Sequence, residues 1–160
     1  MDFAYTELQN DVRASVRLLC ERFDLDYWRG CDERKAYPEE FVHAMSEAGW
    51  LGVLIPEEYG GGGMGVTEAA IVLEEINRSG GSGAACHAQM YTMGALLRHG
   101  GAEQKRRYLP QIASGELRLQ AFGVTEPDAG SDTTQIKTFA RKTDRGYVIS
   151  GQKVFTSRYQ

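Results

Sequence analysis

The hydrophobic period of this sequence changes once, near Gly115, and that change limits the possible folds more than any other feature. Before Gly115, apolar residues recur at the three- and four-residue spacing of amphipathic helices. After it they alternate with polar residues, as in half-buried strands. The sequence therefore predicts an α+β chain, with an all-α N-terminal helical domain over residues 1–115 and the first strands of a β domain over residues 116–160.

About five helices are expected before Gly115. The capping-box pattern Thr6–Gln9 should open the first, whose apolar stripe runs from Leu8 to Phe23. The polar segment 24–37 is predicted to be a connector. The remaining helices are expected from Pro38 to Gly49, after a cap at Thr67, around residues 90–97, and over residues 102–113, where Pro110 should bend or divide the helix.

Strands are expected after Gly115. Alternation at Leu117, Leu119 and Ala121 predicts a first strand that stops at Pro127, because proline cannot donate to a ladder. The other strands are expected over residues 136–140, over 147–149 after a hairpin turn at 144–146, and over 153–157.

Charge and composition exclude several classes of function. The net charge is −4, from 18 basic and 22 acidic residues, which gives no electrostatic case for nucleic-acid binding. No apolar run is long enough for a membrane span, and the acidic N-terminus is unlike a targeting segment. The three cysteines have no Cys-x-x-Cys spacing and the histidines no metal-ligand spacing, so we expect no metal and a cytoplasmic protein with reduced thiols.

Residues 121–132 carry the strongest functional signal. A predicted strand is followed by a loop with Gly130, Ser131 and Asp132, whose small and polar residues let backbone N–H groups approach a ligand. Such a donor-rich loop suits the acceptors of a flavin ring or a phosphate. The alternative is an ordinary surface turn, since these residues are common in turns.

The run Thr125–Asp132 resembles the flavin-binding signature of the acyl-CoA dehydrogenases, and Gly151–Ser157 resembles a later segment of that family. Matches at Ala48–Gly52, Pro56–Gly61 and Lys105–Pro110 extend the resemblance over nearly the whole chain. The resemblance implies an FAD-dependent enzyme that oxidises acyl-CoA to trans-2-enoyl-CoA, by α-proton abstraction and β-hydride transfer, in fatty-acid (lipid) metabolism. It also implies a barrel-like middle β domain, an electron-transfer flavoprotein as acceptor, and a homo-oligomer, either a dimer or a tetramer.

The resemblance also assigns site residues. The implied cofactor-binding residues are Phe122, Val124, Thr125, Gly130, Ser131, Phe155, Thr156 and Ser157, and Ser131 is also implied to bind substrate. Phe155 stands where the family commonly has tryptophan, and Ser157 where it has threonine. The glutamate at position 126 is implied to be structural, and Glu74 and Glu75 are interpreted as helix-face residues. No catalytic residue is assigned, because the family's base is expected beyond Gln160.

Two other functions stay open at this point. The first is an acyl-CoA oxidase or related flavin oxidase of the same superfamily, which would be reoxidised by oxygen. The second is a truncated helical module that binds a partner and is not an enzyme. Because the base and much of the flavin site are expected elsewhere, the 160-residue chain by itself is predicted to be inactive.

Overall fold

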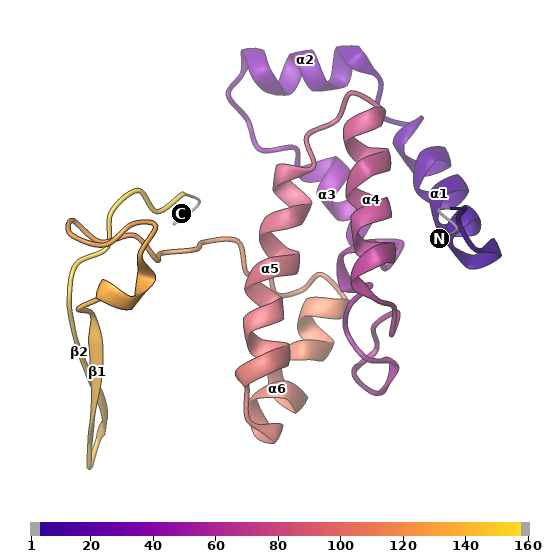
Figure 1. Ribbon diagram of the computed structural model, residues 1–160. Helices are drawn as coiled ribbons and strands as arrows, with labels where there is room; N and C mark the ends of the chain where they lie inside the picture. Colours follow the sequence, from indigo (N-terminus) through magenta and orange to yellow (C-terminus); the bar gives the residue numbers. More distant parts are fainter. Residues whose placement is uncertain (1–3, 158–160) are drawn as a thin grey trace. The chain divides into compact units, whose positions relative to one another are not determined.

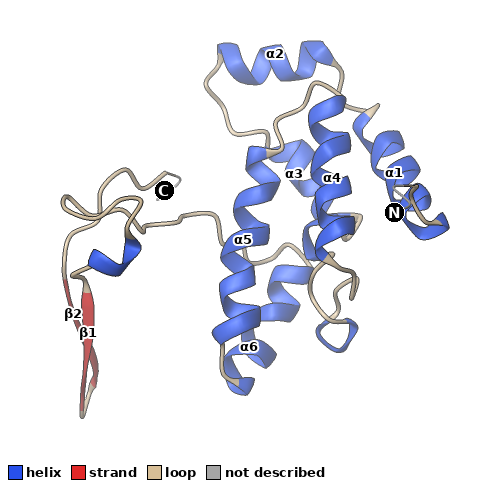
Figure 2. Ribbon diagram, in the orientation of Figure 1, coloured by secondary structure: helices blue, strands red, loops and turns tan. Residues whose placement is uncertain are grey.

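The computed structural model describes residues 4–157 and divides the chain into two compact units. The first unit ends at Leu119 and the second begins at Gln120. Helices make up the first unit and a β-hairpin lies in the second (Figures 1 and 2), so the predicted α+β class is confirmed. The N-terminal residues 1–3 and the segment 158–160, which includes Arg158, lie outside the described residues.

Six α-helices form among the described residues of the first unit. They are α1 (Glu7–Cys20), α2 (Leu25–Glu33), α3 (Glu39–Glu47), α4 (Val66–Arg78), α5 (Ala84–His99) and α6 (Ala102–Ala113), with short 3₁₀ turns at Trp50–Gly52 and Glu57–Tyr59. Five of them, α1, α3, α4, α5 and α6, lie where the sequence predicts helices. Pro110 lies inside α6, which it does not divide.

The predicted connector over residues 24–37 is wrong, because it contains α2. The Asp24 side chain caps this helix by accepting a hydrogen bond from the Tyr27 N–H at 2.9 Å. The helix attaches through a few apolar residues: Cys31 is buried, and Tyr27 and Trp28 pack edge-on against the aromatic rings of Phe23 and Phe41. Because only a few apolar side chains attach α2, most of its sequence is polar, which is why the sequence predicts a connector there.

The ends of two other helices also differ from the prediction. In α1 the capping box forms, with Thr6 and Gln9 bonding reciprocally at 3.1 and 3.2 Å. However, Leu8 is exposed, and Phe23 lies beyond the end of the helix. Helix α4 is capped at Gly65 and not at Thr67, because the Glu68 carboxylate accepts a hydrogen bond from the Gly65 N–H at 2.9 Å.

The main core lies among α1, α3, α4 and the start of α5. Its fully buried members include Val16, Phe41, Met45, Val72 and Ile76. A second, smaller cluster joins Ile55 and Met93 to Leu109 and Ile112 of α6. Within the described residues, no helix is long and apolar enough to cross a membrane.

In the second unit, β1 (Phe139–Thr143) and β2 (Gly146–Ser150) pair antiparallel, with Phe139 opposite Ser150. The predicted hairpin is therefore confirmed. The strand expected over residues 136–140 begins only at Phe139, after a 3₁₀ turn at Thr133–Gln135.

The strands predicted before Pro127 and over residues 153–157 do not form among the described residues. Instead, these two stretches are joined by one backbone hydrogen bond, from the Val154 N–H to the Thr125 carbonyl at 2.9 Å. Alternating residues make a strand only where a neighbour supplies a ladder of hydrogen bonds, and a single bond is not a ladder.

Candidate functional site

Two segments predicted to contact a cofactor lie against each other in the second unit. The bond from Val154 to Thr125 joins their backbones, and the Lys153 ammonium donates to the Val124 carbonyl at 3.0 Å. Gly123 permits this approach, because a Cβ atom there would lie only 3.1 Å from the Thr156 hydroxyl oxygen. The structure therefore brings Val124 and Thr125 together with Thr156, across 31 residues or more of sequence.

The polar groups along residues 124–125 are divided between bonded acceptors and free donors. Both carbonyls accept hydrogen bonds, from Lys153 and from Val154. Among the described residues, neither N–H group nor the Thr125 hydroxyl has a hydrogen-bond partner. Unpaired donors beside satisfied carbonyls suit a ligand that presents acceptors.

Glu126 fixes the start of the loop. The residue is 6% exposed, and its carboxylate accepts hydrogen bonds from the backbone N–H groups of Lys137, at 2.7 Å, and Thr138, at 2.9 Å. The Lys153 ammonium donates a third hydrogen bond to it, at 2.9 Å. With both oxygens engaged, this carboxylate is arranged to hold the backbone in place.

The same neighbours set the protonation state of Glu126. The Thr138 hydroxyl, the Lys137 N–H and the Lys153 ammonium together lower the pKa of Glu126 to about 2. Among the described residues, the Thr138 Oγ1 makes no hydrogen bond of regular geometry. A carboxylate with so low a pKa is ionised at neutral pH and is a poor proton acceptor.

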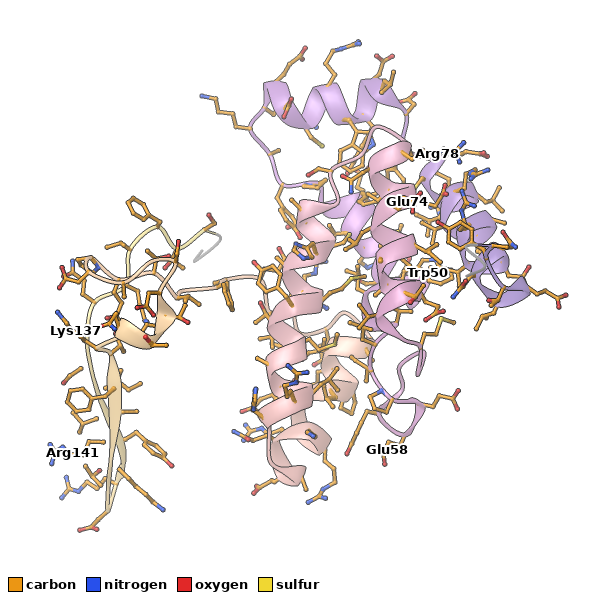
Figure 3. The ribbon with its side chains drawn as sticks, viewed as in Figure 1. Trp50, Glu58, Glu74, Arg78, Lys137 and Arg141 are labelled. Atoms are coloured by element: carbon orange, nitrogen blue, oxygen red, sulfur yellow. The ribbon has the colours of Figure 1, made fainter. Side chains whose placement is uncertain are left out.

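The loop after Glu126 is held at both ends. Glu126 and Ala129 exchange two backbone hydrogen bonds, at 2.8 and 3.2 Å, around a turn with Pro127 and Asp128 at its tip. Asp128 pairs with Lys137, which lies just before β1 (Figure 3), at 2.8 Å. Further on, the Asp132 side chain accepts from the Thr134 N–H at 3.1 Å, and hydrogen bonds from Thr134 lower the pKa of Asp132.

Gly130 and Ser131 are exposed between these two fixed points. A Cβ atom at Gly130 would meet nothing within 4 Å. No hydrogen bond among the described residues joins Gly130 or Ser131 to the segments around Thr125 and Thr156. The structure therefore presents them to solvent but does not unite them with the other predicted site residues.

The two predicted aromatic contacts are both accessible. Phe155 is 91% exposed and has a left-handed backbone, with φ of 58°. Phenylalanine rarely adopts that conformation, which costs on the order of 1 kcal/mol or more. Phe122 is 50% exposed. An exposed ring on a strained backbone is typical of a ligand-contacting position, because the ligand can cover it.

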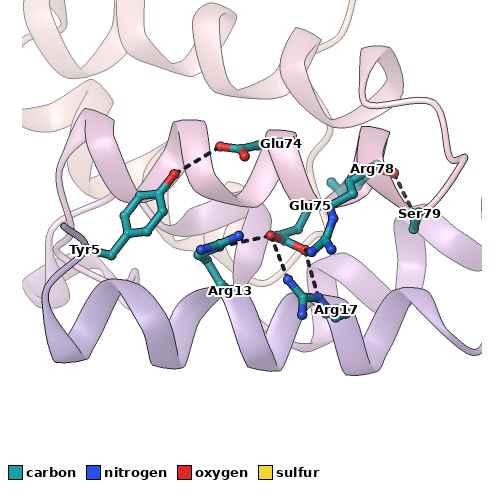
Figure 4. Close-up of polar contacts among 8 residues, drawn as sticks. Tyr5, Arg13, Arg17, Glu74, Glu75, Arg78 and Ser79 are labelled. Carbon is teal, nitrogen blue, oxygen red and sulfur yellow. Dashed lines mark hydrogen bonds and ion pairs between the residues drawn. The ribbon is translucent and has the colours of Figure 1, made fainter. Parts of the chain in front are cut away.

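Two contributors to the structure are missed by the sequence interpretation. Lys153 makes two of the hydrogen bonds that order the site, and only its place in the Gly151–Ser157 segment could have singled it out. The other is Glu75, which was interpreted as a helix-face residue but is 2% exposed. It is surrounded by Arg13, Arg17 and Arg78 between α1 and α4 (Figure 4).

No group of three histidine, cysteine, aspartate or glutamate side chains within residues 4–157 could hold a metal ion. Within the described residues, the three cysteines, Cys20, Cys31 and Cys86, are buried and form no disulfide. His87 lies in α5, where its ring packs against Tyr91 at 4.9 Å between centroids. The cysteines therefore pack inside the helical unit, whereas His87 is exposed.

Comparison with known families covers both units. Residues 6–116 match the family described as acyl-CoA dehydrogenase, N-terminal domain, and residues 121–159 match acyl-CoA dehydrogenase, middle domain. The acyl-CoA dehydrogenase FadE12 of Mycobacterium tuberculosis is 35% identical over 156 residues, which cover 97% of this chain and 40% of that protein. The chain thus spans about two fifths of the length of the curated relatives it matches.

Solved structures agree with these matches. The chain resembles a glutaryl-coenzyme A dehydrogenase in complex with glutaryl-CoA, with a TM-score of 0.83 and 32% identity over 98% of this chain and 40% of that one. It also resembles an acyl-CoA dehydrogenase of Bacillus anthracis complexed with FAD, with a TM-score of 0.81 and 29% identity over 95% of this chain and 27% of that one. These comparisons favour neither the flavin oxidase nor the non-enzymatic module.

Proposed function

Because this chain belongs to the acyl-CoA dehydrogenase family, we propose that it is part of an FAD-dependent enzyme that oxidises acyl-CoA thioesters to trans-2-enoyl-CoA. The proposal concerns the whole protein, since the curated relatives are longer than this chain. The observation that carries it is the row of unpaired donors at Val124 and Thr125, on a backbone whose carbonyls are already bonded.

The chain's own residues would bind the flavin through complementary chemistry. The ring edge of FAD presents nitrogen and oxygen acceptors, which the N–H groups of Val124 and Thr125 and the Thr125 hydroxyl can meet. Phe122 and Phe155 supply accessible aromatic faces, and Thr156 and Ser157 supply hydroxyl groups. When bound, FAD supplies the acceptor for the substrate's β hydride.

The exposed loop at Gly130 and Ser131 would contact the pyrophosphate of FAD or the pantetheine arm of the substrate. Small residues there let backbone N–H groups approach an anionic or carbonyl oxygen closely. We assign Ser131 to both cofactor and substrate. No catalytic residue is assigned within residues 1–160, and the hydrogen bonds to both oxygens of Glu126 support a structural role for this carboxylate and not that of the base.

We further propose the context of the whole enzyme from the family resemblance. Its electrons would pass to an electron-transfer flavoprotein, it would form a dimer or tetramer of identical subunits, and it would act in fatty-acid metabolism in the cytoplasm. Reoxidation of the reduced protein by this flavoprotein, measured against reoxidation by oxygen, tests the assignment as a dehydrogenase.

The test of the flavin site is Thr125→Ala in the complete enzyme. Loss of a donor at the ring edge should weaken FAD binding about three- to tenfold or slow flavin reduction, since one hydrogen bond contributes roughly 0.5–1.5 kcal/mol. Thr133→Ala is the matched control, because it removes the same group from an exposed position in the same loop. Equal FAD affinity and equal reduction rates for wild type and Thr125→Ala would contradict the assignment.

A further inference from the structure

The two proposed flavin-binding segments are joined by the Val154 N–H and also by the side chain of Lys153. Its ammonium lies 3.0 Å from the Val124 carbonyl oxygen and 2.9 Å from Oε1 of Glu126. The lysine side chain is 29% exposed and that of Glu126 is 5% exposed. The buried carboxylate therefore holds a positive charge directly against the Val124 carbonyl.

That carbonyl shares a peptide group with the N–H of Thr125. A cation on the oxygen of a peptide group withdraws electron density from its nitrogen, which makes the N–H a stronger hydrogen-bond donor. In the next peptide group both polar groups are hydrogen-bonded, because the Thr125 carbonyl accepts from the Val154 N–H and the Glu126 N–H donates to the Ala129 carbonyl. The polarised Thr125 N–H, in contrast, has no partner among the described residues.

The hydrogen bond from Lys153 to Val124 is not needed to hold the segments together. The Val154 N–H already links them, and the N–H groups of Lys137 and Thr138 already hold the Glu126 carboxylate. What this bond adds is a charge placed on one particular peptide group.

From this geometry we propose that Lys153 is a positioning residue, which orients and polarises the Thr125 N–H toward an acceptor on the flavin ring. The inference rests on the proposed function. Its consequence is electrostatic: a fixed positive charge, transmitted through the peptide group, stabilises the electron-rich reduced flavin more than the oxidised form. Lys153 should therefore raise both the affinity for FAD and the reduction potential of the bound flavin.

The experiment compares Lys153→Met, Lys153→Arg and Lys137→Met in the FAD-loaded enzyme. Two quantities are measured for each: the dissociation constant for FAD and the midpoint potential of the bound flavin. Lys153→Met should raise the dissociation constant roughly tenfold, as expected when a charge-assisted contact is lost, and shift the potential to a more negative value. Lys153→Arg keeps the charge and should restore both toward wild type.

Lys137→Met is the matched control. It removes the same charge from the same unit, but the ammonium of Lys137 pairs with Asp128 at an exposed position, with side chains 72% and 71% exposed. Its potential should equal that of wild type. If Lys153→Met cannot be loaded with FAD, Lys153→Gln serves in its place, since an amide can still donate to the Val124 carbonyl without a charge.

The outcomes separate the inference from the proposed function. A weaker affinity with an unchanged potential would mean that Lys153 is only structural and would overturn the inference, as would a Lys137→Met shift equal to that of Lys153→Met. In both cases the wild-type enzyme still binds FAD, so the proposed function stands. If wild type itself binds no FAD, the proposed function fails and the role of Lys153 fails with it.

Discussion

Glu75 offers a direct test of how the helical unit is stabilised, through its replacement by glutamine. Its carboxylate accepts hydrogen bonds from Arg13 at 3.0 Å and from two nitrogens of Arg17 at 3.1 and 3.2 Å, and Arg78 lies at 3.5 Å (Figure 4). The contacts of Arg13 and Arg17 join α4 to α1, two of the helices that surround the main core. The Arg17 hydrogen bond, opposed by burial, lowers the pKa of Glu75, so the group is ionised at neutral pH.

The expected loss of stability depends on which side chains of this ion-pair cluster are buried. The Glu75 side chain is 1% exposed, whereas those of Arg13 and Arg78 are 26% and 59% exposed. Removing one partner of a fully buried ion pair costs roughly 3–5 kcal/mol. Because these arginines can turn toward water, we expect Glu75→Gln to lower the free energy of unfolding by about 2–3 kcal/mol. Arg78→Met, at an exposed position, should cost about 0.5 kcal/mol or less.

Urea titration followed by tryptophan fluorescence measures both values. Trp28 and Trp50 are the tryptophans of the chain, and both pack against the core of the helical unit, so they report its unfolding. The midpoint of Glu75→Gln should fall well below that of Arg78→Met with an unchanged slope. Equal losses of stability in the two variants would refute the argument, because they would show that burial of the carboxylate does not govern its contribution.

Three further predictions concern other positions. The pKa of Glu126 is lowered from 4.5 to about 2 in the folded state, so the stability that this carboxylate contributes is complete above pH 4.5 and is lost as the pH falls through 2. Amide exchange of the second unit should therefore depend on acid pH in the wild type, and Glu126→Gln should remove that dependence. Gly61→Ala should destabilise the helical unit by about 2 kcal/mol or more, since its Cβ would lie 2.7 Å from the Gly52 carbonyl oxygen. Gly94→Ala places its Cβ in open space in α5 and should stabilise the unit by about 0.5–1 kcal/mol, as measured by the same urea titration. Thr6→Ala should lower the free energy of unfolding by about 1 kcal/mol, because the α1 cap is lost. Thermal unfolding followed by helical circular dichroism measures this loss, and an unchanged melting temperature would contradict it.

The helices could be predicted where their signals are local. A capping box, an apolar stripe and flanking glycines lie within one helix length, so α1, α3, α4, α5 and α6 follow from the sequence. Helix α2 does not, because its apolar contacts come from few side chains and depend on aromatic partners such as Phe41, which belongs to a different helix. Its only local signal is the cap at Asp24.

The strands show a different limit. The β1–β2 hairpin is closed by a two-residue turn, so its pairing partner lies close in sequence and could be predicted. The segments around Thr125 and Val154 have equally strand-like patterns, but each needs neighbours on both sides to form a ladder. Alternation alone cannot say whether those neighbours exist, which is why these predictions failed.

The composition of the candidate site could be predicted, but its organisation could not. Resemblance pointed to the segments around Thr125 and Thr156, and the structure places these two together. The lysine that orders them is 27 residues from the carboxylate it bonds. No local pattern specifies an ion pair at that separation, because the pairing depends on the tertiary path of the chain.

The buried ion pairs of Glu75 and Glu126 have different consequences in the two units. Both carboxylates are buried and bonded to cations, from residues 62 and 27 positions away in sequence respectively. The difference lies in what else the cation contacts. In the helical unit, the guanidinium groups around Glu75 join two helices, and the outcome is stability. In the second unit, the Lys153 ammonium also donates to the Val124 carbonyl, and the N–H of that peptide group has no partner among the described residues. In the role proposed for Lys153, its charge acts on a group that a ligand can use, so burial of a carboxylate would stabilise one unit and tune binding in the other.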